Sequence, residues 1–112
     1  MEKNFKKDLT LKGNSVKRLL KEYKMYVSEV EKLQSKYNEM ISEGQDDYQL
    51  KKQNEYLQES ISVRDNVKPK LRKMTDELIS YFSDIPAEIQ ETEEYKTAAE
   101  IIESVKPIFL IE

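Results

Sequence analysis

The stretch that decides the fold covers residues 16–41, VKRLLKEYKMYVSEVEKLQSKYNEMI. Its apolar residues recur at alternating intervals of three and four, which places them at positions a and d of a heptad repeat. A second apolar line lies beside them at position e and is interrupted only by Gln34. The a and d residues are Val16, Leu19, Tyr23, Tyr26, Val30, Leu33, Tyr37 and Met40, and the e residues are Leu20, Val27 and Ile41. A stripe of this width predicts a long amphipathic helix that contacts two other helices.

The composition of the 112-residue chain fits long, solvated helices. Charged residues make up 37% of it, and it contains only two glycines and three prolines, too few for the many turns of an all-β fold. The chain has no cysteine and no histidine. These absences exclude disulfides, thiolate metal sites, cysteine nucleophiles and histidine general bases. We therefore expect one all-α domain over residues 1–112. Glycine-rich phosphate loops and the residue spacings of calcium and zinc sites are also absent. The many carboxylates leave an acid/base pair open by residue type, but straight helices favour a solvated acidic face, so we expect no enzyme activity and no cofactor or metal.

Two breaks divide the heptad pattern into three helices. Gly44 is suited to end the first helix, and Asp46 or Asp47 to cap the second. Pro86 is suited to the start of a third helix and Pro107 to its end. The expected helices cover about residues 4–43, 47–82 and 87–106, followed by an apolar tail at 107–112. Because the connections are short, we predict an antiparallel up-down-up three-helix bundle with long, coiled-coil-like helices.

Two residues interrupt these helices without shifting the heptad phase. Gly13 lies at position e and costs about 1 kcal/mol of helix propensity relative to Ala. Either the first helix continues through Gly13, or Asn14 and Ser15 cap a new start there; the preserved phase favours continuity. Pro69 removes one backbone hydrogen bond in the second helix, for which we predict a kinked but continuous helix rather than two separate ones.

Charge is distributed unevenly along the chain. Residues 1–24 hold eight basic and three acidic residues, whereas residues 75–112 hold two basic and ten acidic ones. In an up-down-up bundle the first and third helices are parallel, so their oppositely charged starts would favour the correct register. The basic stretch would suit phosphates, but the chain as a whole is acidic, which favours a solvated face or an acidic protein partner over nucleic acid.

The expected location is the cytoplasm. No stretch approaches the roughly 20 apolar residues that span a bilayer, and residues 1–8 lack the apolar region of a signal peptide. A membrane-surface helix would need a free apolar face, and here that face is expected to be buried in the bundle. Tyr48 and Tyr56 lie off the apolar stripe and are candidates for contact with another protein.

Three segments match motifs of a known family in the right order. They are residues 16–22 with Tyr26, residues 48–60, and residues 93–96 with Ala98. The most specific part is the run Lys-Lys-Gln, then Glu, then Leu-Gln-Glu-Ser within residues 51–60. These segments resemble the tubulin-binding cofactor A family, also called tubulin-specific chaperone A. The chain departs from the family pattern at Pro69, at Tyr56, where a smaller aliphatic residue is common, and in its longer apolar tail after Val105.

The resemblance implies a non-catalytic folding cofactor that uses no nucleotide or metal. Such a protein captures β-tubulin released from the cytosolic chaperonin and holds it until other tubulin-folding cofactors assemble it with α-tubulin. The location implied is the cytoplasm and the microtubule cytoskeleton, and the family includes both monomers and homodimers. The alternative is a structural coiled-coil or oligomerisation module with no tubulin role.

Motif residues without a place in the apolar stripe are the candidates for partner binding. They are Lys17, Arg18 and Lys21 on the first helix, and Lys51, Lys52, Glu55, Tyr56 and Glu59 on the second. Each of them would equally suit a solvated helix face.

Overall fold

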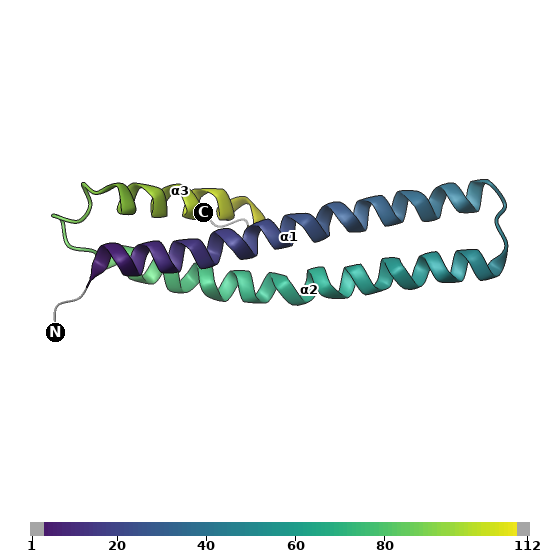
Figure 1. Ribbon diagram of the computed structural model, residues 1–112, viewed down its shortest axis with the longest axis horizontal. Helices are drawn as coiled ribbons and strands as arrows, with labels where there is room; N and C mark the ends of the chain where they lie inside the picture. The colour runs from purple at the N-terminus through teal and green to yellow at the C-terminus, as the bar shows by residue number, and fades with distance from the viewer. Residues whose placement is uncertain (1–3, 110–112) are drawn as a thin grey trace. The chain divides into compact units, whose positions relative to one another are not determined.

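The computed structural model describes residues 4–109 and contains three helices, with no strand among these residues (Figure 1). The helices are α1 (Phe5–Ser42), α2 (Asp47–Ser83) and α3 (Glu93–Phe109). The predicted all-α three-helix fold is confirmed. The chain divides into two compact units: unit 1 is Met1–Leu20 with Pro69–Glu112, and unit 2 is Lys21–Lys68. The prediction of a single domain over the whole chain stays a prediction.

Unit 1 contains all three helices. The first part of α1 runs antiparallel to the last part of α2, and α3 lies parallel to α1 (Figure 1). The up-down-up order is therefore present in this unit. Its core consists of side chains from all three helices that are at most 2% exposed. They are Leu9, Val16, Leu71, Thr75, Leu78, Ala98 and Val105.

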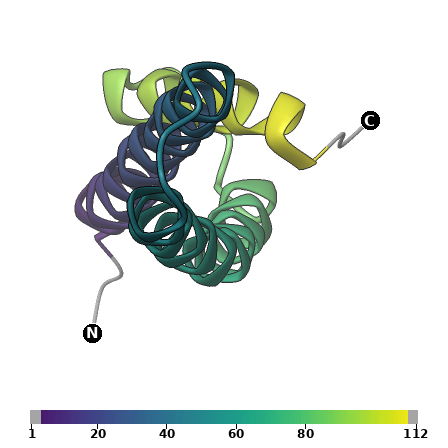
Figure 2. The ribbon, with the colours of Figure 1, turned by 90° about the vertical axis from the view of Figure 1, so that its right-hand side faces the viewer.

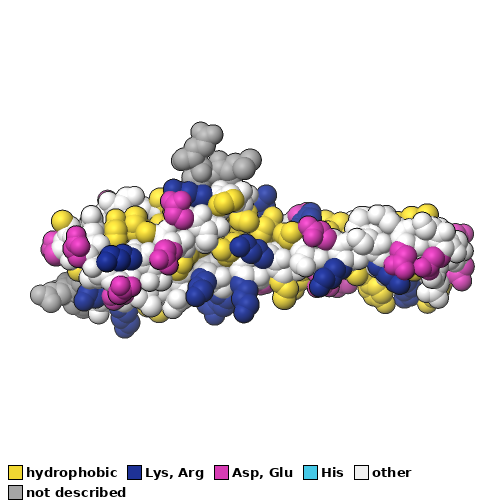
Figure 3. Space-filling view, turned by 90° about the horizontal axis from the view of Figure 1, so that it is seen from above, with side chains coloured by type: hydrophobic (Ala, Val, Ile, Leu, Met, Phe, Trp, Pro, Cys, Tyr) yellow, Lys and Arg dark blue, Asp and Glu magenta, His cyan; other side chains and the backbone are white. Residues whose placement is uncertain are grey.

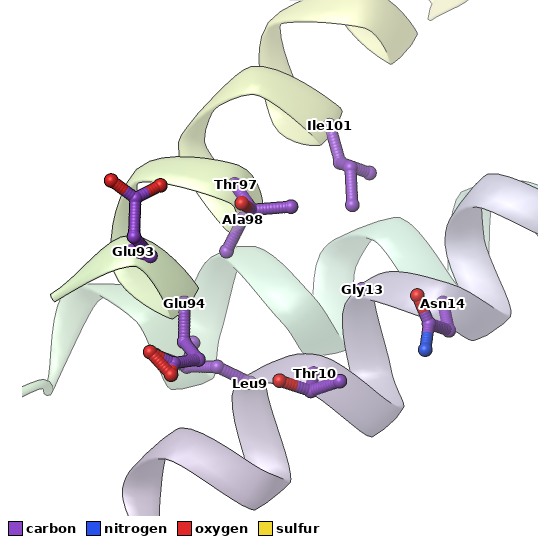
Figure 4. A pocket seen from close by; sticks show the side chains of 9 residues that line it. All are labelled: Leu9, Thr10, Gly13, Asn14, Glu93, Glu94, Thr97, Ala98 and Ile101. Atoms are coloured by element: carbon purple, nitrogen blue, oxygen red, sulfur yellow. The ribbon is translucent and has the colours of Figure 1, made fainter.

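Gly13 allows α3 to approach α1 closely. The helix continues through Gly13, as predicted, and Gly13 itself is buried. A Cβ atom built at this position would lie 3.2 Å from Cδ1 of Ile101 on α3, closer than ordinary van der Waals contact. Figure 4 shows the Ile101 side chain pointing toward the backbone at Gly13, beside a groove of about 250 Å³ between the two helices. Glycine at this position thus costs helix propensity and leaves room for the Ile101 side chain.

Unit 2 is an antiparallel pair formed by the rest of α1 and α2. Figure 2 faces the turn that joins them. Gly44 has a φ of 72°, and the bonds from its N–H to the Ile41 carbonyl and from the Gln45 N–H to the Met40 carbonyl form a Schellman motif. Asp46 caps α2, because its Oδ1 accepts a hydrogen bond of 2.8 Å from the Gln49 N–H. The predicted turn is therefore confirmed, with Asp46 as the cap.

The width of the apolar stripe has different consequences in the two units. In unit 1 the e positions Gly13 and Leu20 are buried. In unit 2, which contains no part of α3, Val27 is half-buried and Ile41 is 52% exposed. The expectation that Ile41 belongs to the buried stripe is therefore wrong, because a pair of helices covers only the a and d positions.

α2 is continuous through Pro69, as predicted, whereas the predicted bend at Pro69 stays a prediction. Polar residues occupy several of its a and d positions in unit 2. Gln53 donates a hydrogen bond of 3.1 Å to the Leu33 carbonyl across the pair, and Arg64 is half-buried with its Nε 3.0 Å from Asp65. The Arg64 guanidinium therefore reaches a charged partner, although its backbone occupies a core position of the heptad.

Both ends of α3 differ from the prediction. The helix begins at Glu93 rather than at residue 87, because Thr92 acts as its cap: the Tyr95 N–H donates to Thr92 Oγ1 at 3.3 Å. The segment from Pro86 to Thr92 forms turns with bonds between residues three apart. Stacking of Phe82 on Tyr95, with ring centroids 4.2 Å apart, fixes the start of α3 on α2.

Pro107 does not end α3, which continues to Phe109. A proline near a helix end loses only one hydrogen bond, and the last turn is held by the Arg72 guanidinium, which lies 5.2 Å from the Phe109 ring centroid. The predicted tail therefore begins as helix, and the rest of it, residues 110–112, lies outside the described residues.

A polar contact joins α1 to α2 near the outer end of unit 1. The Tyr81 hydroxyl donates a hydrogen bond of 2.8 Å to Asp8 Oδ2, the Lys12 ammonium lies 5.3 Å from the Tyr81 ring centroid, and Phe5 packs on the same ring. Desolvation, the hydrogen bond to Asp8 and the negative charge of Asp8, in that order, raise the pKa of Tyr81 to about 12.

Replacing Gly13 by Ala should stabilise the protein. The change relieves about 0.5–1 kcal/mol of backbone entropy, and the Cδ1 atom of Ile101 is the free end of a flexible side chain that can turn into the adjacent groove. Urea unfolding followed by circular dichroism should show a higher midpoint, and Asn14→Ala at the exposed neighbouring position measures the gain from helix propensity alone. A lower midpoint for Gly13→Ala would mean that Ile101 cannot move.

Thr75 offers a second stability test. Its side chain is fully buried, and its Oγ1 has no hydrogen-bond partner among the described residues. Thr75→Val keeps the shape and removes the unpaired hydroxyl, so it should raise the free energy of unfolding by about 1 kcal/mol. Thr75→Ala, which removes the hydroxyl but leaves a cavity, should not. Equal loss of stability in both variants would show that the hydroxyl is satisfied.

The raised pKa of Tyr81 predicts a loss of stability at alkaline pH. Because the folded state holds the Tyr81 proton more tightly than the unfolded chain, whose pKa is 10.0, its stabilising effect is present below pH 10. That effect is lost as the pH rises from about 10 to about 12. The midpoint of urea unfolding should fall more steeply over this range for the wild type than for Tyr81→Phe. Parallel curves would rule out the Tyr81–Asp8 contact as the cause.

Candidate functional site

The predicted residues on α2 form one continuous exposed surface in unit 2. Its members, with Tyr48 added because it lies on the same face, are Tyr48, Lys51, Lys52, Glu55, Tyr56 and Glu59. Tyr48, Lys52 and Tyr56 follow one another at intervals of four and so lie in a line along the helix. The two tyrosines are 65% and 55% exposed. We call this set the α2 surface.

This face is free because the opposite side of α2 packs against α1. Leu57 and Ser60 are buried, Ser60 Oγ lies 3.5 Å from Glu29 Oε1, and Gln53 bonds to the Leu33 carbonyl. These contacts fix the rotation of the helix and turn the α2 surface outward. Within it, the Lys52 ammonium lies 5.8 Å from the Tyr48 ring centroid, so the two side chains form a local cation–π contact.

The predicted residues on α1 are divided between the two units. Lys17 and Arg18 are exposed in unit 1, and Lys21 is the exposed first residue of unit 2. Within unit 2, the contact of Glu29 with Ser60 sets the register of the two helices, and Lys21 lies eight residues farther from the turn than Glu29. At 1.5 Å per residue, Lys21 is therefore separated from the α2 surface by roughly 13–30 Å along the pair of helices. That these residues act together in binding a partner stays a prediction.

Sequence reasoning missed two exposed apolar residues on α1. Leu11 is 56% exposed and Met25 is 55% exposed. Both fall at position c of the heptad, on the outward side of the helix, so an apolar residue at c was the signal that could have revealed them. Figure 3, which views the structure from above Figure 1, shows hydrophobic side chains at the surface among charged side chains of both signs.

The described residues contain no group of three or more His, Cys, Asp or Glu side chains placed to hold a metal ion. Among the same residues, no helix is long and apolar enough to cross a membrane. Grooves between helices of unit 1 are open to solvent, such as the one beside Gly13 (Figure 4).

Comparison with known proteins identifies the family. The family model for tubulin binding cofactor A matches residues 4–102. A tubulin-specific chaperone A from Gallus gallus is 38% identical over 100 residues, which cover 89% of this chain and 92% of that protein. The crystal structure of tubulin folding cofactor A from Arabidopsis thaliana superposes with a TM-score of 0.84 at 28% identity, covering 92% of this chain and 96% of that one.

The structure of human tubulin chaperone cofactor A is similar as well. It superposes with a TM-score of 0.82 at 31% identity, and the match covers 91% of this chain and 98% of the human chain. The family model spans parts of all three helices, and the coverage of the relatives is nearly complete. The chain belongs to the tubulin binding cofactor A family.

Proposed function

We propose that this protein is a non-catalytic tubulin-folding cofactor that captures β-tubulin after its release from the cytosolic chaperonin. It holds the client until other cofactors assemble it with α-tubulin. The observation that carries the proposal is the family match over residues 4–102, together with relatives that are named tubulin-specific chaperone A. Holding a client requires only a binding surface, which fits a chain whose exposed features are side chains on helix faces.

The α2 surface suits this role chemically. Tyr48 and Tyr56 are rigid, amphipathic side chains of the type that anchors protein interfaces, and both are already exposed. Neither tyrosine packs in the interface between α1 and α2, so binding through them would leave the helix pair intact. Lys51 and Lys52 stand beside them and would attract an acidic client, which raises the association rate and makes binding sensitive to salt.

The basic residues of α1 would supply a second contact. Lys17, Arg18 and Lys21 are exposed, and none of them forms an ion pair with a described residue. Their charges are therefore available to a partner.

Reversing the two lysines of the α2 surface should weaken capture without unfolding the protein. Lys51→Glu/Lys52→Glu changes two exposed charges, so helicity should stay unchanged while the affinity for purified β-tubulin falls about tenfold at low salt. The loss should shrink as ionic strength rises. Sedimentation or a pull-down with purified β-tubulin and α-tubulin, measured at two salt concentrations, provides the measurement.

The matched control is Lys24→Glu/Lys68→Glu, which makes the same charge change at exposed positions of unit 2 away from the α2 surface. Equal weakening in both double variants would show a general charge effect and remove the α2 surface from the binding site. If the wild type ignores β-tubulin and instead self-associates, the structural coiled-coil module becomes the better reading.

A further inference from the structure

A small apolar pocket opens between α1 and α2 in unit 1. It has a volume of about 170 Å³ and is lined by Leu11, Lys12, Ser15, Met74 and Glu77. The α1 residues occupy heptad positions c, d and g, whereas the residue nearest α3, Gly13, occupies position e. The pocket therefore lies on the side of the α1–α2 pair that α3 does not cover. We call it the Leu11 pocket.

The apolar part of this pocket faces solvent rather than the core. Leu11 is 56% exposed and Met74 is half-buried. An exposed leucine at the rim of a pocket offers a bulky apolar side chain a place to lose its water-accessible surface. A volume of about 170 Å³ is enough to receive one such side chain.

Positive charge lies at one end of the pocket. Because α1 and α2 are antiparallel, residues that follow Leu11 on α1 and residues that precede Met74 on α2 lie at the same end. These residues include Arg18, Lys70 and Lys73, and all three are exposed. No described carboxylate forms an ion pair with any of them.

Negative charge lies at the other end. A second groove of about 440 Å³ continues from the pocket and shares Lys12 and Glu77 with it. It is lined also by Asp76, Ser80, Tyr81 and Asp84. Arg72 neutralises only one of these carboxylates, through an ion pair of 3.4 Å with Asp76. The second groove thus holds three carboxylates and one ammonium, that of Lys12, so its excess of negative charge lies at the end opposite Arg18, Lys70 and Lys73.

We propose that the Leu11 pocket binds an acidic segment of the client that carries one bulky apolar side chain. The apolar side chain enters between Leu11 and Met74, and the carboxylates of the segment extend toward Arg18, Lys70 and Lys73. The acidic groove at the other end repels the same segment and so fixes its direction. The proposal rests on the proposed function, since it takes β-tubulin as the client, but it concerns a surface other than the α2 surface.

Two pairs of variants test the proposal with purified β-tubulin. Leu11→Ser should weaken binding about tenfold, as expected for the loss of one buried leucine contact. Met25→Ser changes an equally exposed residue at the same heptad position that is not among the residues lining the Leu11 pocket, and this variant should bind as the wild type does. Lys70→Glu/Lys73→Glu should weaken binding and flatten its salt dependence, whereas Lys24→Glu/Lys68→Glu should change neither. Circular dichroism checks that each variant is folded.

A photo-crosslink identifies the segment directly. Leu11 is replaced by p-benzoylphenylalanine in the full chain, the complex with β-tubulin is irradiated, and the linked peptide is sequenced by mass spectrometry. The proposal expects a segment of β-tubulin with net negative charge and an aliphatic or aromatic residue at the point of linkage. A basic segment, or a link to a second copy of this chain, would overturn it.

The outcomes separate this inference from the proposed function. If the wild type fails to bind β-tubulin, the proposed function is wrong. If the wild type binds but Leu11→Ser binds equally well, the proposed function stands and the Leu11 pocket is not part of the site. Equal losses for Leu11→Ser and Met25→Ser would also exclude the pocket, because they would reflect general surface hydrophobicity.

Discussion

The structure depends on how many helices cover the apolar stripe of α1. The stripe is three positions wide, and burying its third line requires a second partner helix. In unit 1 that partner is α3, and the contact is closest at Gly13, where any side chain would approach Ile101. The surrounding core side chains from three helices are almost fully buried, so the hydrophobic stabilisation of the chain is concentrated in this unit.

Unit 2 follows the same heptad pattern with a thinner core. Its buried apolar residues are Met40, Leu57 and Val67. Between its two helices lie also Gln53 and Ser60, which form hydrogen bonds from α2 to Leu33 and Glu29 of α1. A pair of helices with so little buried surface keeps most of each helix face in water. This explains why unit 2 holds the exposed Tyr48 and Tyr56: side chains that the core does not use remain available for a partner.

The sequence predicted the features that are encoded locally. The unbroken heptad phase predicted that α1 continues through Gly13 and α2 through Pro69, and both helices do. The turn at Gly44–Asp46 follows from the backbone preference of glycine and the capping preference of aspartate. The start of α3 was misplaced because Pro86 and Thr92 both signal a helix start, and tertiary stacking on Phe82 decides between them. The exposure of the residues of the α2 surface could be predicted, because they lie outside the apolar stripe of α2. The Leu11 pocket could not, since Met74 reaches it only through the register of two packed helices.

The basic start and the acidic end of the sequence affect the helices without forming ion pairs between them. Among the described residues there are three ion pairs, two within α2 and one within α3, and none joins α1 to α3. Oppositely charged starts of parallel helices can still favour the register through their summed field, which acts beyond contact distance. Since exposed pairs contribute little to stability, leaving the cations unpaired costs little. It leaves Arg18, Lys70 and Lys73 of unit 1 available to carboxylates of another protein, and such contacts affect the orientation and the association rate of the complex.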